Sequence, residues 1–588
     1  MERSSYIKGP RTFGDARPQP TPNVRLAPER WFNLPSWQRS LFPASSSFDA
    51  AAGAWLLLAD GEGFADRLAD KLRQAGQDVI CLRPDVDRPE QFDELFARLD
   101  REDRPIGRIV HCTTLCRSSD ERFGTSISLP HGATSLLQIA RAVSRRKKSQ
   151  PLSLLVITNR LQDISGFERP CPNKAVLPVF CRCMAQELTN ARCVIVDLPP
   201  PLEAQPLAVQ YGRYADRLLA EIETGKEPTV AYRQDWRLVQ TYSAVEIGAD
   251  GPVLRDMVRG GLYVITGGLG YIALELAQRL ARECQAKLLL IARGTFPERS
   301  RWRSIADSSS DATASIARKL LQMEAAGSEV VVATADVSNA GALTQVLDKA
   351  EARFGPVRGV FHLAADFSHG SHQRRMADMD DADLTTQMRP KSGALLALIE
   401  ALGARRIDFG IAFSSTSAVL AGVGYGAYAA ANAVMDSMIC SRSDPRLDPW
   451  MSLNWDKWPR PDIVPDAYAL EFEEGLDALW RACRFSSVPQ LVISAMPLQP
   501  RVDTWVRVRR PVQAERSAPA SELAAKSTDE KILPRSALER QIAAIWQELL
   551  GIEAVGVTES FLDLGGDSLI GIRVISRIKE AFRVNLKP

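Results

Sequence analysis

Two stretches of the chain repeat one order of elements: a short apolar strand, a turn containing glycine, an amphipathic helix and a second apolar strand. They are AWLLLADGEGFADRLADKLRQAGQDVICLR from Ala54 and GLYVITGGLGYIALELAQRLARECQAKLLLIAR from Gly261. This βαβ order is typical of a doubly wound parallel sheet. Its repetition indicates an internal duplication. We therefore predict an α/β protein with two Rossmann-like lobes, of which one is structural and one catalytic.

The two glycine turns differ in charge. The first contains Asp60 and Glu62, and these carboxylates would repel the pyrophosphate of a dinucleotide. The second is uncharged and matches the G-x-G-x-x-G/A form, so its backbone N–H groups and the following helix N-terminus can take an anion. We expect a nucleotide in the second lobe only. The contacts predicted there are Thr266, Gly267, Gly268, Leu269, Gly270, Tyr271 and Ile272.

The second strand of the second repeat ends at Arg293. An NAD enzyme usually carries an acid at this place, for the 2′-hydroxyl of the ribose, whereas arginine suits a 2′-phosphate. A solvated surface arginine is the alternative interpretation. Its position about 20 residues beyond the glycines favours NADPH as the cofactor.

A serine, a tyrosine and an asparagine form the candidate catalytic group. Tyr428 and Asn432 are four residues apart in an Ala-rich helical segment and share one helix face. Ser415 ends the preceding strand, so its side chain and that of Tyr428 can converge on one carbonyl oxygen. Reduction of a ketone needs a proton donor, and a phenol is a weak one unless a cation lowers its pKa. A lysine is therefore expected close by.

Charge and composition exclude several classes of function. The 73 Lys and Arg residues balance 71 Asp and Glu residues, which gives no reason to expect nucleic acid as a partner. No apolar run approaches the roughly 20 residues that span a bilayer, so no membrane segment is expected. The ten cysteines and five histidines show no metal-ligand spacing, and we expect no metal and reduced thiols in a cytoplasm.

Composition also suggests the domain boundaries. A stretch rich in charge, Ala, Pro and Ser follows Leu498, and ALERQIAAIWQELLG then has one apolar helical face. The expected organisation is an N-terminal linker over 1–30, a structural lobe that does not bind cofactor over 31–245, a catalytic lobe over 246–500, a linker over 501–535, and a small helical domain over 536–588.

The stretch from Trp31 to Leu498 resembles the ketoreductase domain of modular polyketide synthases, a complex short-chain dehydrogenase. The matching pieces are FNLPSWQRS, AWLLLADGEG, LLVITNRLQDISG, YVITGGLGYIALELA, GVFHLAAD, RPKSGALLAL, FSSTSAVLAGVGYGAYAAANAVMD, LNWDKW and EEGLDAL. The resemblance implies that Tyr428 donates the proton, Ser415 binds the substrate carbonyl, Lys391 of RPKSGA supplies the cation, and Asn432 positions the relay. It further implies nucleotide contacts at Asp336, Val337 and Ala364.

The segment GVTESFLDLGGDSLIGIRVISRIKEAF resembles the attachment site of acyl and peptidyl carrier proteins. The resemblance implies that Ser568 carries 4′-phosphopantetheine, added by a phosphopantetheinyl transferase. An Asp-Ser pair that merely caps a helix is the alternative interpretation. Such carriers normally continue beyond the position of Pro588, so we expect a partial all-α bundle and a native chain that is longer at both ends.

The expected activity is NADPH-dependent reduction of a β-ketoacyl thioester, held on a carrier among other polyketide synthase domains, to a β-hydroxyacyl thioester. An α-ketoacyl reductase and a catalytically silent scaffold remain as alternatives. The resemblance leaves the configuration of the product open, because the Leu-Asp-Asp signature of one ketoreductase class is absent and Leu420 stands where the other class has tryptophan. His369 and His372 are either substrate contacts or solvent-facing.

Overall fold

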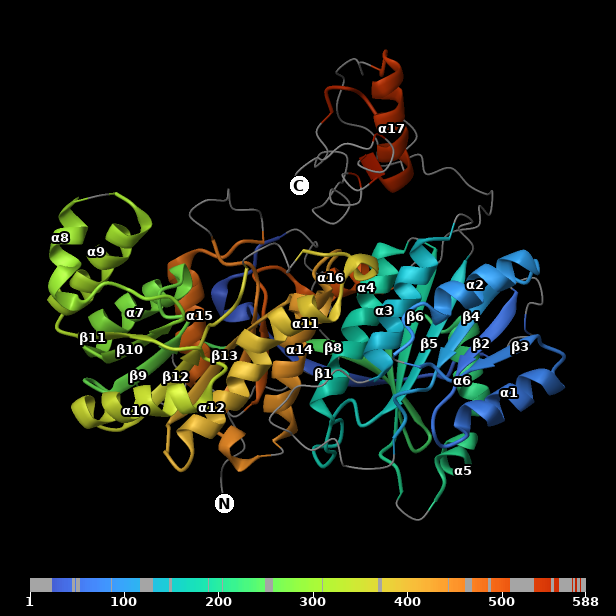
Figure 1. Cartoon of the computed structure of the whole chain (residues 1–588), viewed down its shortest axis with the longest axis horizontal. Coiled ribbons are helices and arrows are strands. Elements are labelled where there is room, and N and C mark those ends of the chain that lie inside the picture. Colours follow the sequence, from blue (N-terminus) through green and yellow to red (C-terminus); the bar gives the residue numbers. More distant parts are fainter. Residues whose placement is uncertain are drawn as a thin grey trace, which may run out of the picture. The chain divides into compact units, whose positions relative to one another are not determined.

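The protein forms two compact units, which are residues 1–509 and 510–588 (Figure 1). The computed structural model describes residues 24–44, 48, 53–85, 87–116, 131–146, 151–188, 190–202, 205–248, 257–308, 310–367, 373–442, 444–459, 468–484, 488–507, 533–550, 555–559, 574, 577–578 and 582. The first unit contains both lobes. Among the described residues no helix is long and apolar enough to cross a membrane.

One 15-stranded sheet runs through the first unit, in the order β11-β10-β9-β12-β13-β14-β15-β1-β8-β7-β6-β5-β4-β2-β3. The strands are β1 Phe32–Ser40, β2 Ala54–Leu58, β3 Val79–Leu82, β4 Ile106–His111, β5 Leu152–Asn159, β6 Ala191–Leu198, β7 Thr229–Arg233, β8 Trp236–Val245, β9 Leu262–Thr266, β10 Lys287–Ala292, β11 Glu329–Thr334, β12 Val357–His362, β13 Phe409–Ser415, β14 Trp450–Trp455 and β15 Gln490–Ile493.

The sheet consists of two parallel halves with an antiparallel junction. Strands β2 to β7 pair in parallel in one half, and β9 to β15 do so in the other. Strand β1 lies between them and pairs antiparallel with β15 on one side and β8 on the other. The predicted two-lobed α/β fold is confirmed, and β1 joins its lobes into one sheet.

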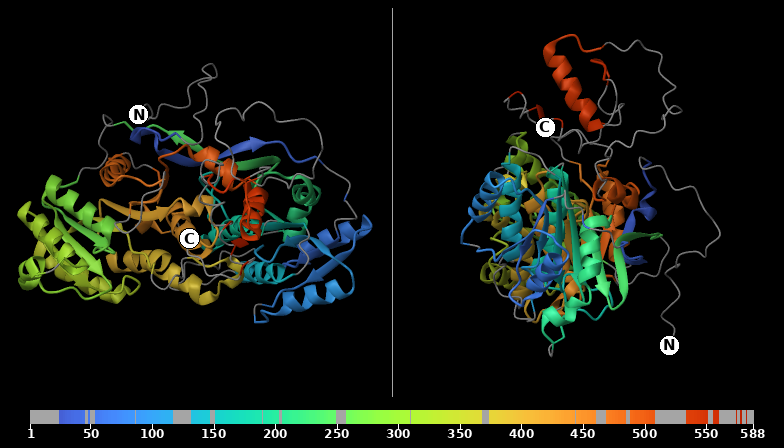
Figure 2. Two further views of the ribbon diagram at one scale, coloured as in Figure 1. Left: turned by 90° about the horizontal axis from the view of Figure 1, so that it is seen from above. Right: turned by 90° about the vertical axis from the view of Figure 1, so that its right-hand side faces the viewer.

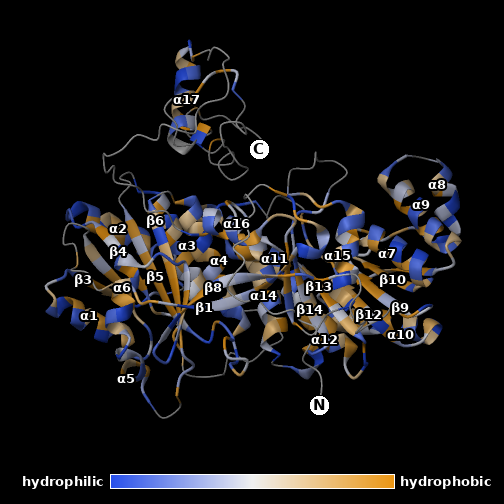
Figure 3. Cartoon of the chain, turned by 180° about the vertical axis from the view of Figure 1, so that it is seen from behind, coloured by the Kyte–Doolittle hydropathy of each residue, from blue (hydrophilic) through white to orange (hydrophobic). Residues whose placement is uncertain are grey.

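Helices lie on both faces of the sheet, as the views from above and from the side show (Figure 2). In the first lobe they are α1 Phe64–Gln74, α2 Gln91–Arg101, α3 His131–Ser144, α4 Val176–Glu187, α5 Leu207–Gly212 and α6 Ala215–Thr224. In the second lobe they are α7 Tyr271–Cys284, α8 Trp302–Ser308, α9 Ala312–Ala325, α10 Ala340–Phe354, α11 Asp381–Met388, α12 Ala394–Leu402, α13 Ser417–Leu420, α14 Gly426–Ser441, α15 Phe472–Arg484 and α16 Leu498–Trp505. Their apolar sides face the strands, which are mostly hydrophobic (Figure 3).

Successive side chains of each strand point to opposite faces of the sheet and so belong to different apolar cores. On one face a single apolar cluster runs through both lobes, from Leu56 of β2 to Val264 of β9. On the other face each lobe has a cluster of its own, which includes Trp55 in the first and Tyr263 in the second. The shared face is therefore where the two lobes pack as one body.

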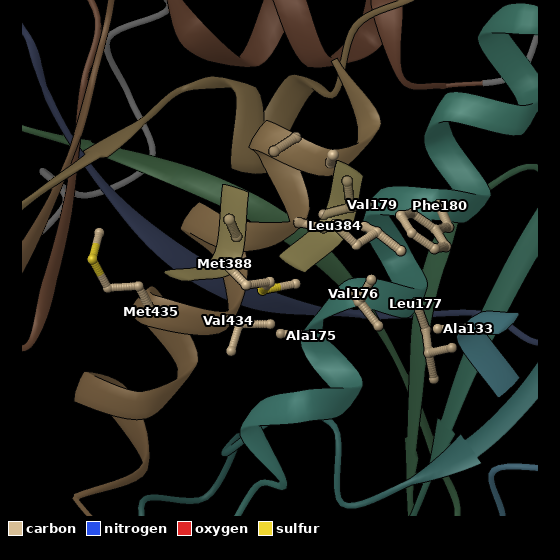
Figure 4. Packing of buried hydrophobic residues seen from close by; sticks show 14 of the residues in the cluster. Ala133, Ala175, Val176, Leu177, Val179, Phe180, Leu384, Met388, Val434 and Met435 are labelled. Carbon is tan, nitrogen blue, oxygen red and sulfur yellow. The ribbon is translucent and has the colours of Figure 1, made fainter. Parts of the chain in front are cut away.

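Helices α4, α11 and α14 form the centre of this shared core. Figure 4 shows Val176 and Val179 of α4 beside Leu384 and Met388 of α11 and Val434 of α14, and all of these side chains are buried. Burial of apolar surface stabilises a fold, so this interface holds the two lobes together. Helix α4 of the first lobe thus packs directly against the helices of the second.

The catalytic lobe extends beyond its expected end at residue 500. Helix α16 crosses that boundary, and its Leu498 and Val502 are buried. Arg501 donates to both carboxylate oxygens of Asp456, at 2.8 and 2.9 Å, which ties the helix to the chain after β14. Residues 501–505, expected in the linker, therefore belong to a packed helix, whereas the charged stretch begins at Val506, after this helix.

The first helix described in the second unit is the expected one, α17 Ala537–Leu550. Ser536 Oγ accepts the N–H of Glu539 at 3.0 Å, and Glu539 Oε2 accepts the N–H of Ser536 at 2.9 Å. This reciprocal pair is a capping box, which fixes where the helix starts.

Strand β13 gives a test of packing in the sheet. A Cβ atom at Gly410 would lie 2.3 Å from the Trp450 ring of β14, whereas one at Gly61 would have nothing within 4 Å. Gly410→Ala should lower the free energy of unfolding by about 1–3 kcal/mol, the usual cost of overpacking a core. Urea denaturation measures this, with Gly61→Ala as the matched control. Equal midpoints for the two variants would contradict the packing described here.

Candidate functional site

The turn between β9 and α7 has the shape of an anion cradle. Gly267 has φ +66°, and a Cβ on it would lie 3.1 Å from the backbone of Ala364. A Cβ on Gly268 would lie 2.8 Å from Leu290 Cα, and Gly270 is the residue before the first turn of α7. Only glycine fits at the first two positions, because backbone surrounds them closely. The turn therefore fits a nucleotide pyrophosphate at the α7 N-terminus.

The corresponding turn in the first lobe is filled by its own carboxylate. Asp60, which is buried, accepts the N–H groups of Glu62 at 2.9 Å, Phe64 at 3.1 Å and Ala65 at 2.7 Å. These are the donors at the start of α1 that a phosphate would use. The first turn therefore differs from the second in two ways. Its charge would repel a phosphate, as expected, and its N–H donors are already bonded to Asp60.

Two ion pairs lie at the end of the site where the adenosine is expected. Arg293, directly after β10, is 2.8 Å from Asp366 beyond β12, and the Arg293 side chain is 72% exposed. Asp336 pairs with Arg389 at 2.5 Å and also accepts from Ser338. Burial raises the pKa of Asp336, but the hydrogen bonds from Ser338 and the positive charges of Arg389 and Arg293 outweigh it, so the pKa is lowered overall. The described structure therefore places Arg293 on a carboxylate that an incoming phosphate would have to replace.

His362 connects the glycine turn to the catalytic region. Its Nδ1 lies 2.7 Å from Thr266 Oγ1, and its Nε2 lies 3.1 Å from the backbone oxygen of Lys391. Burial, reinforced by the Lys391 ammonium, lowers the pKa of His362 to about 3, so the ring is neutral. A carbonyl only accepts, so Nε2 carries the proton and Nδ1 accepts from Thr266.

Lys391 lies in a π-helical turn over Arg389–Gly393, between α11 and α12, and is buried. Single π turns often mark functional positions in helices. Its Nζ donates to the backbone oxygen of Phe413 at 2.7 Å, two residues before Ser415. Burial lowers the pKa of Lys391 to about 8, and the carboxylate of Asp436 works against this shift. The expected cation is therefore anchored on the strand that carries the serine.

Tyr428 lies in the first turn of α14 and is partly exposed. Burial of its environment raises the pKa of Tyr428 to about 12, while the side chains of Ser415 and Asn432 lower it by hydrogen bonding. Asn432 is buried and donates from Nδ2 to the backbone oxygen of Tyr428 at 2.9 Å. The ring of Phe367 packs against that of Tyr428 with centroids 5.6 Å apart. The structure thus brings Ser415, Tyr428 and Asn432 together.

A buried polar network fixes the backbone of Ser415. Asn454 of β14 donates to Ser414 Oγ at 2.9 Å, to the backbone oxygen of Ser415 at 3.2 Å and to Asp436 at 2.6 Å. Burial raises the pKa of Asp436 to about 6, whereas hydrogen bonds from Ser452, Ser414 and Asn454 lower it. Because Asp436 lies two turns after Tyr428 on α14, the network ties that helix to β13 and β14.

Helix α4 of the first lobe holds the segment between Ser415 and Tyr428. Arg182 donates to the backbone oxygens of Ala418 and Val419 at 3.1 and 2.9 Å, and Gln186 to that of Leu420 at 2.8 Å. Glu187 accepts the N–H of Gly424 at 3.0 Å and that of Met376 at 2.8 Å. Helix α4 thus holds both the segment before Tyr428 and the turn that begins at Met376.

Sequence reasoning missed these supporting residues, which are Arg182, Gln186, Glu187, Asp436, Asn454 and His362. The only signal in the sequence was their polar character within otherwise apolar stretches. Leu420 is buried in a cluster with Val419, Leu498 and Val502. His369, His372 and Ser568 lie outside the described residues. Among the described residues no group of three or more His, Cys, Asp or Glu could hold a metal ion.

Two family models match the chain. Residues 261–460 match the KR domain, and residues 540–588 match the phosphopantetheine attachment site. The 5-methyl-1-naphthoate synthase of Streptomyces sahachiroi is 28% identical over 342 residues, which are 56% of this chain and 19% of that protein. One phenolphthiocerol/phthiocerol polyketide synthase polypeptide of Mycobacterium tuberculosis is 25% identical over 467 residues, which are 75% and 24%. The chain thus spans about a fifth to a quarter of these curated relatives.

Solved structures agree on the fold. A structure described as A-type ketoreductases from a modular polyketide synthase superposes with a TM-score of 0.63 at 22% identity. It covers 81% of this chain, and the match spans 96% of that one. The likeness therefore takes in both lobes, beyond the 200 residues that the KR model matches.

The two hydrogen bonds that Glu187 accepts, from Gly424 and Met376, form a clamp that can be tested by hydrogen exchange. Glu187→Gln replaces one acceptor with a donor and leaves a buried N–H, of Gly424 or Met376, without its partner. The loss of such a bond costs about 1–3 kcal/mol, so we expect that amide to exchange about tenfold faster or more. Glu94→Gln, on the exposed side of α2, is the control. Unchanged exchange at both amides would rule out the clamp.

Proposed function

We propose that this chain, which contains a ketoreductase domain followed by a phosphopantetheine attachment domain, reduces a β-ketoacyl thioester to a β-hydroxyacyl thioester with NADPH. The observation that carries the proposal is the convergence of Ser415, Tyr428 and Asn432, on a strand end and the next helix, beside a glycine turn that fits a pyrophosphate. Two contacts favour a reductase over a silent scaffold: Ser415 and Asn432 hydrogen-bond with Tyr428, and Lys391 is bonded to the strand that ends at Ser415.

NADPH supplies a hydride when it is bound. The glycine turn from Thr266 to Ile272 would hold its pyrophosphate, with Ala364 against Gly267 as the floor of the turn. Arg293 would bind the 2′-phosphate in place of Asp366, and Asp336 and Val337 would contact the adenine. The first lobe would bind none, since Asp60 occupies the donors of its turn.

Tyr428 would donate the proton to the carbonyl oxygen of the substrate. The phenol carries its proton at neutral pH, but burial raises its pKa to about 12, in the opposite direction to the lowering by a cation that the sequence led us to expect. Ser415 Oγ accepts the backbone N–H of Ser417 at 3.1 Å, and its own hydrogen can then be donated to the same carbonyl oxygen. Lys391 would place a positive charge near the phenolate that forms, and Asn432 would position the relay that returns the proton.

The substrate would be a polyketide intermediate carried by a phosphopantetheine arm. The attachment domain at residues 540–588 supports this, and we propose Ser568 as its modified residue, loaded by a phosphopantetheinyl transferase. The relatives are polyketide synthases several times longer than this chain, which supports further synthase domains as partners. A thioester on a long flexible arm can reach a site that is partly open at Tyr428.

The role of Tyr428 can be tested with NADPH oxidation and a β-ketoacyl thioester of a short pantetheine analogue. Tyr428→Phe should lower kcat by about 10²- to 10⁴-fold, the usual contribution of a general acid, with NADPH binding retained. The control is Tyr425→Phe, because Tyr425 lies three residues earlier and its hydroxyl accepts from Gln373. It should keep nearly all of the activity.

Each other outcome has a definite meaning. Equal turnover in the parent and in Tyr428→Phe would overturn the assignment of the proton donor. Turnover of an α-ketoacyl but not a β-ketoacyl thioester would replace the proposed substrate. Binding of NADPH by the parent without turnover of either thioester would favour a silent scaffold.

Arg293 decides the choice between the two nicotinamide cofactors. Arg293→Ala should raise the KM for NADPH by about 10- to 100-fold, since a hydrogen bond to a charged group contributes about 1.5–3 kcal/mol. The KM for NADH should change little, because NADH lacks the 2′-phosphate. Steady-state kinetics with both cofactors measures this, with the exposed Arg299→Ala as control. An equal loss for both cofactors would show that Arg293 has another role.

A further inference from the structure

The first lobe contains a counterpart of the catalytic site. Strands β4 and β12 hold equivalent places in the two halves of the sheet, and each ends in a buried histidine, His111 and His362. The residue five positions after each histidine is Cys116 in the first lobe and Phe367 in the second. The next strands, β5 and β13, end at Asn159 and Ser415. The duplication therefore places Cys116 where Phe367 packs against the catalytic tyrosine.

Lys174 completes this second cluster. It lies in the 3-10 turn Pro172–Ala175 directly before α4, the helix that corresponds to α14, and it is 1% exposed. Its Nζ is 3.1 Å from Cys116 Sγ, 2.8 Å from the backbone oxygen of Thr114, and 3.1 and 3.0 Å from the backbone and side-chain oxygens of Asn159. Asn159 in turn donates to the backbone oxygen of Cys116 at 2.9 Å. The lysine and the thiol are thus held together from both sides.

The sulfur of Cys116 is in contact with a buried cation. Of the four groups that contact Lys174 Nζ, three are neutral oxygens and the fourth is a thiol. Among the described residues no carboxylate lies within ion-pair distance of Nζ, although a buried ammonium is costly unless it is paired. The thiol is the one contact that can become an anion, and a cation in contact with sulfur stabilises the thiolate. Cys116 remains partly exposed above the buried lysine.

We propose that Cys116 and Lys174 form a second reactive centre, which adds to α,β-unsaturated carbonyl compounds. The Cys116 thiolate forms an S–C bond at the β-carbon of the acceptor, and the electron pair of the C=C bond moves to the α-carbon. A proton from water or from the Lys174 ammonium completes the addition at that carbon. No oxidant, reductant or leaving group is needed, and the adduct is a covalent modification of the first lobe.

The test is limited labelling of the full chain with N-ethylmaleimide between pH 6 and pH 8, read peptide by peptide by mass spectrometry. The reference is free glutathione, labelled in the same solution. An ordinary thiol ionises near pH 8.5, so its labelling rate should fall close to 100-fold between pH 8 and pH 6. On the proposal, the rate at Cys116 should fall by less than about tenfold, because the Lys174 ammonium contacts the reacting sulfur. Comparing each cysteine with itself cancels differences in access.

Two variants separate the cation from the fold. Lys174→Met should restore a steep pH dependence at Cys116 and lower its rate at pH 6 by about tenfold or more, and Lys174→Arg should retain the parent profile. Lys226→Met, at an exposed lysine, is the matched control. Circular dichroism and NADPH oxidation report on folding. A steep profile at Cys116 in the parent overturns the proposal, and does so even where Lys174→Met fails to fold. An unchanged profile in a folded Lys174→Met variant also overturns it.

Discussion

The packing of α4 against α11 and α14 is the contact on which the geometry of the site depends. It buries apolar side chains from both lobes in one core, and it aims the polar end of α4 at the segment before Tyr428. Arg182, Gln186 and Glu187 then bind backbone groups that helices and strands leave unpaired there. Buried backbone groups need such partners, so the first lobe supplies what the second cannot. The first lobe, whose glycine turn is filled by Asp60, thereby holds the segment that leads to Tyr428.

Inside the second lobe, a series of hydrogen bonds links the cofactor turn to the catalytic strand. It runs from Thr266 through the neutral ring of His362 to the backbone of Lys391, and from Lys391 Nζ to the backbone of Phe413. Each member is buried, and a buried network is stable only when its groups are satisfied together. The glycine turn and the strand that carries Ser415 are thus joined through buried side chains.

The sequence predicted the features that depend on local pattern. The glycine turn, the strand ending at Ser415 and the i, i+4 pair of Tyr428 and Asn432 follow from spacing alone, because strand and helix periods fix where such side chains lie. The long-range features could not be predicted in this way. Strand β1 pairs with strands some 200 and 460 residues away, and Arg293 meets Asp366 across the sheet edge. The hydrogen bonds from α4 to the segment before Tyr428 have no pattern of their own, since each joins a side chain to a backbone group of the other lobe.

The two lobes diverge at one end of the fold and correspond at the other. At the nucleotide end, Asp60 takes the donors of the first turn, and β3 is the outermost strand described beyond β2, whereas both β10 and β11 follow β9. At the other end the positions correspond closely, with a buried histidine and a polar residue ending equivalent strands. The first lobe has Lys174 just before α4, close to the place that Tyr428 takes at the start of α14. A buried lysine there contacts a partly exposed thiol, and this pair is stable because the cation and the sulfur can satisfy each other.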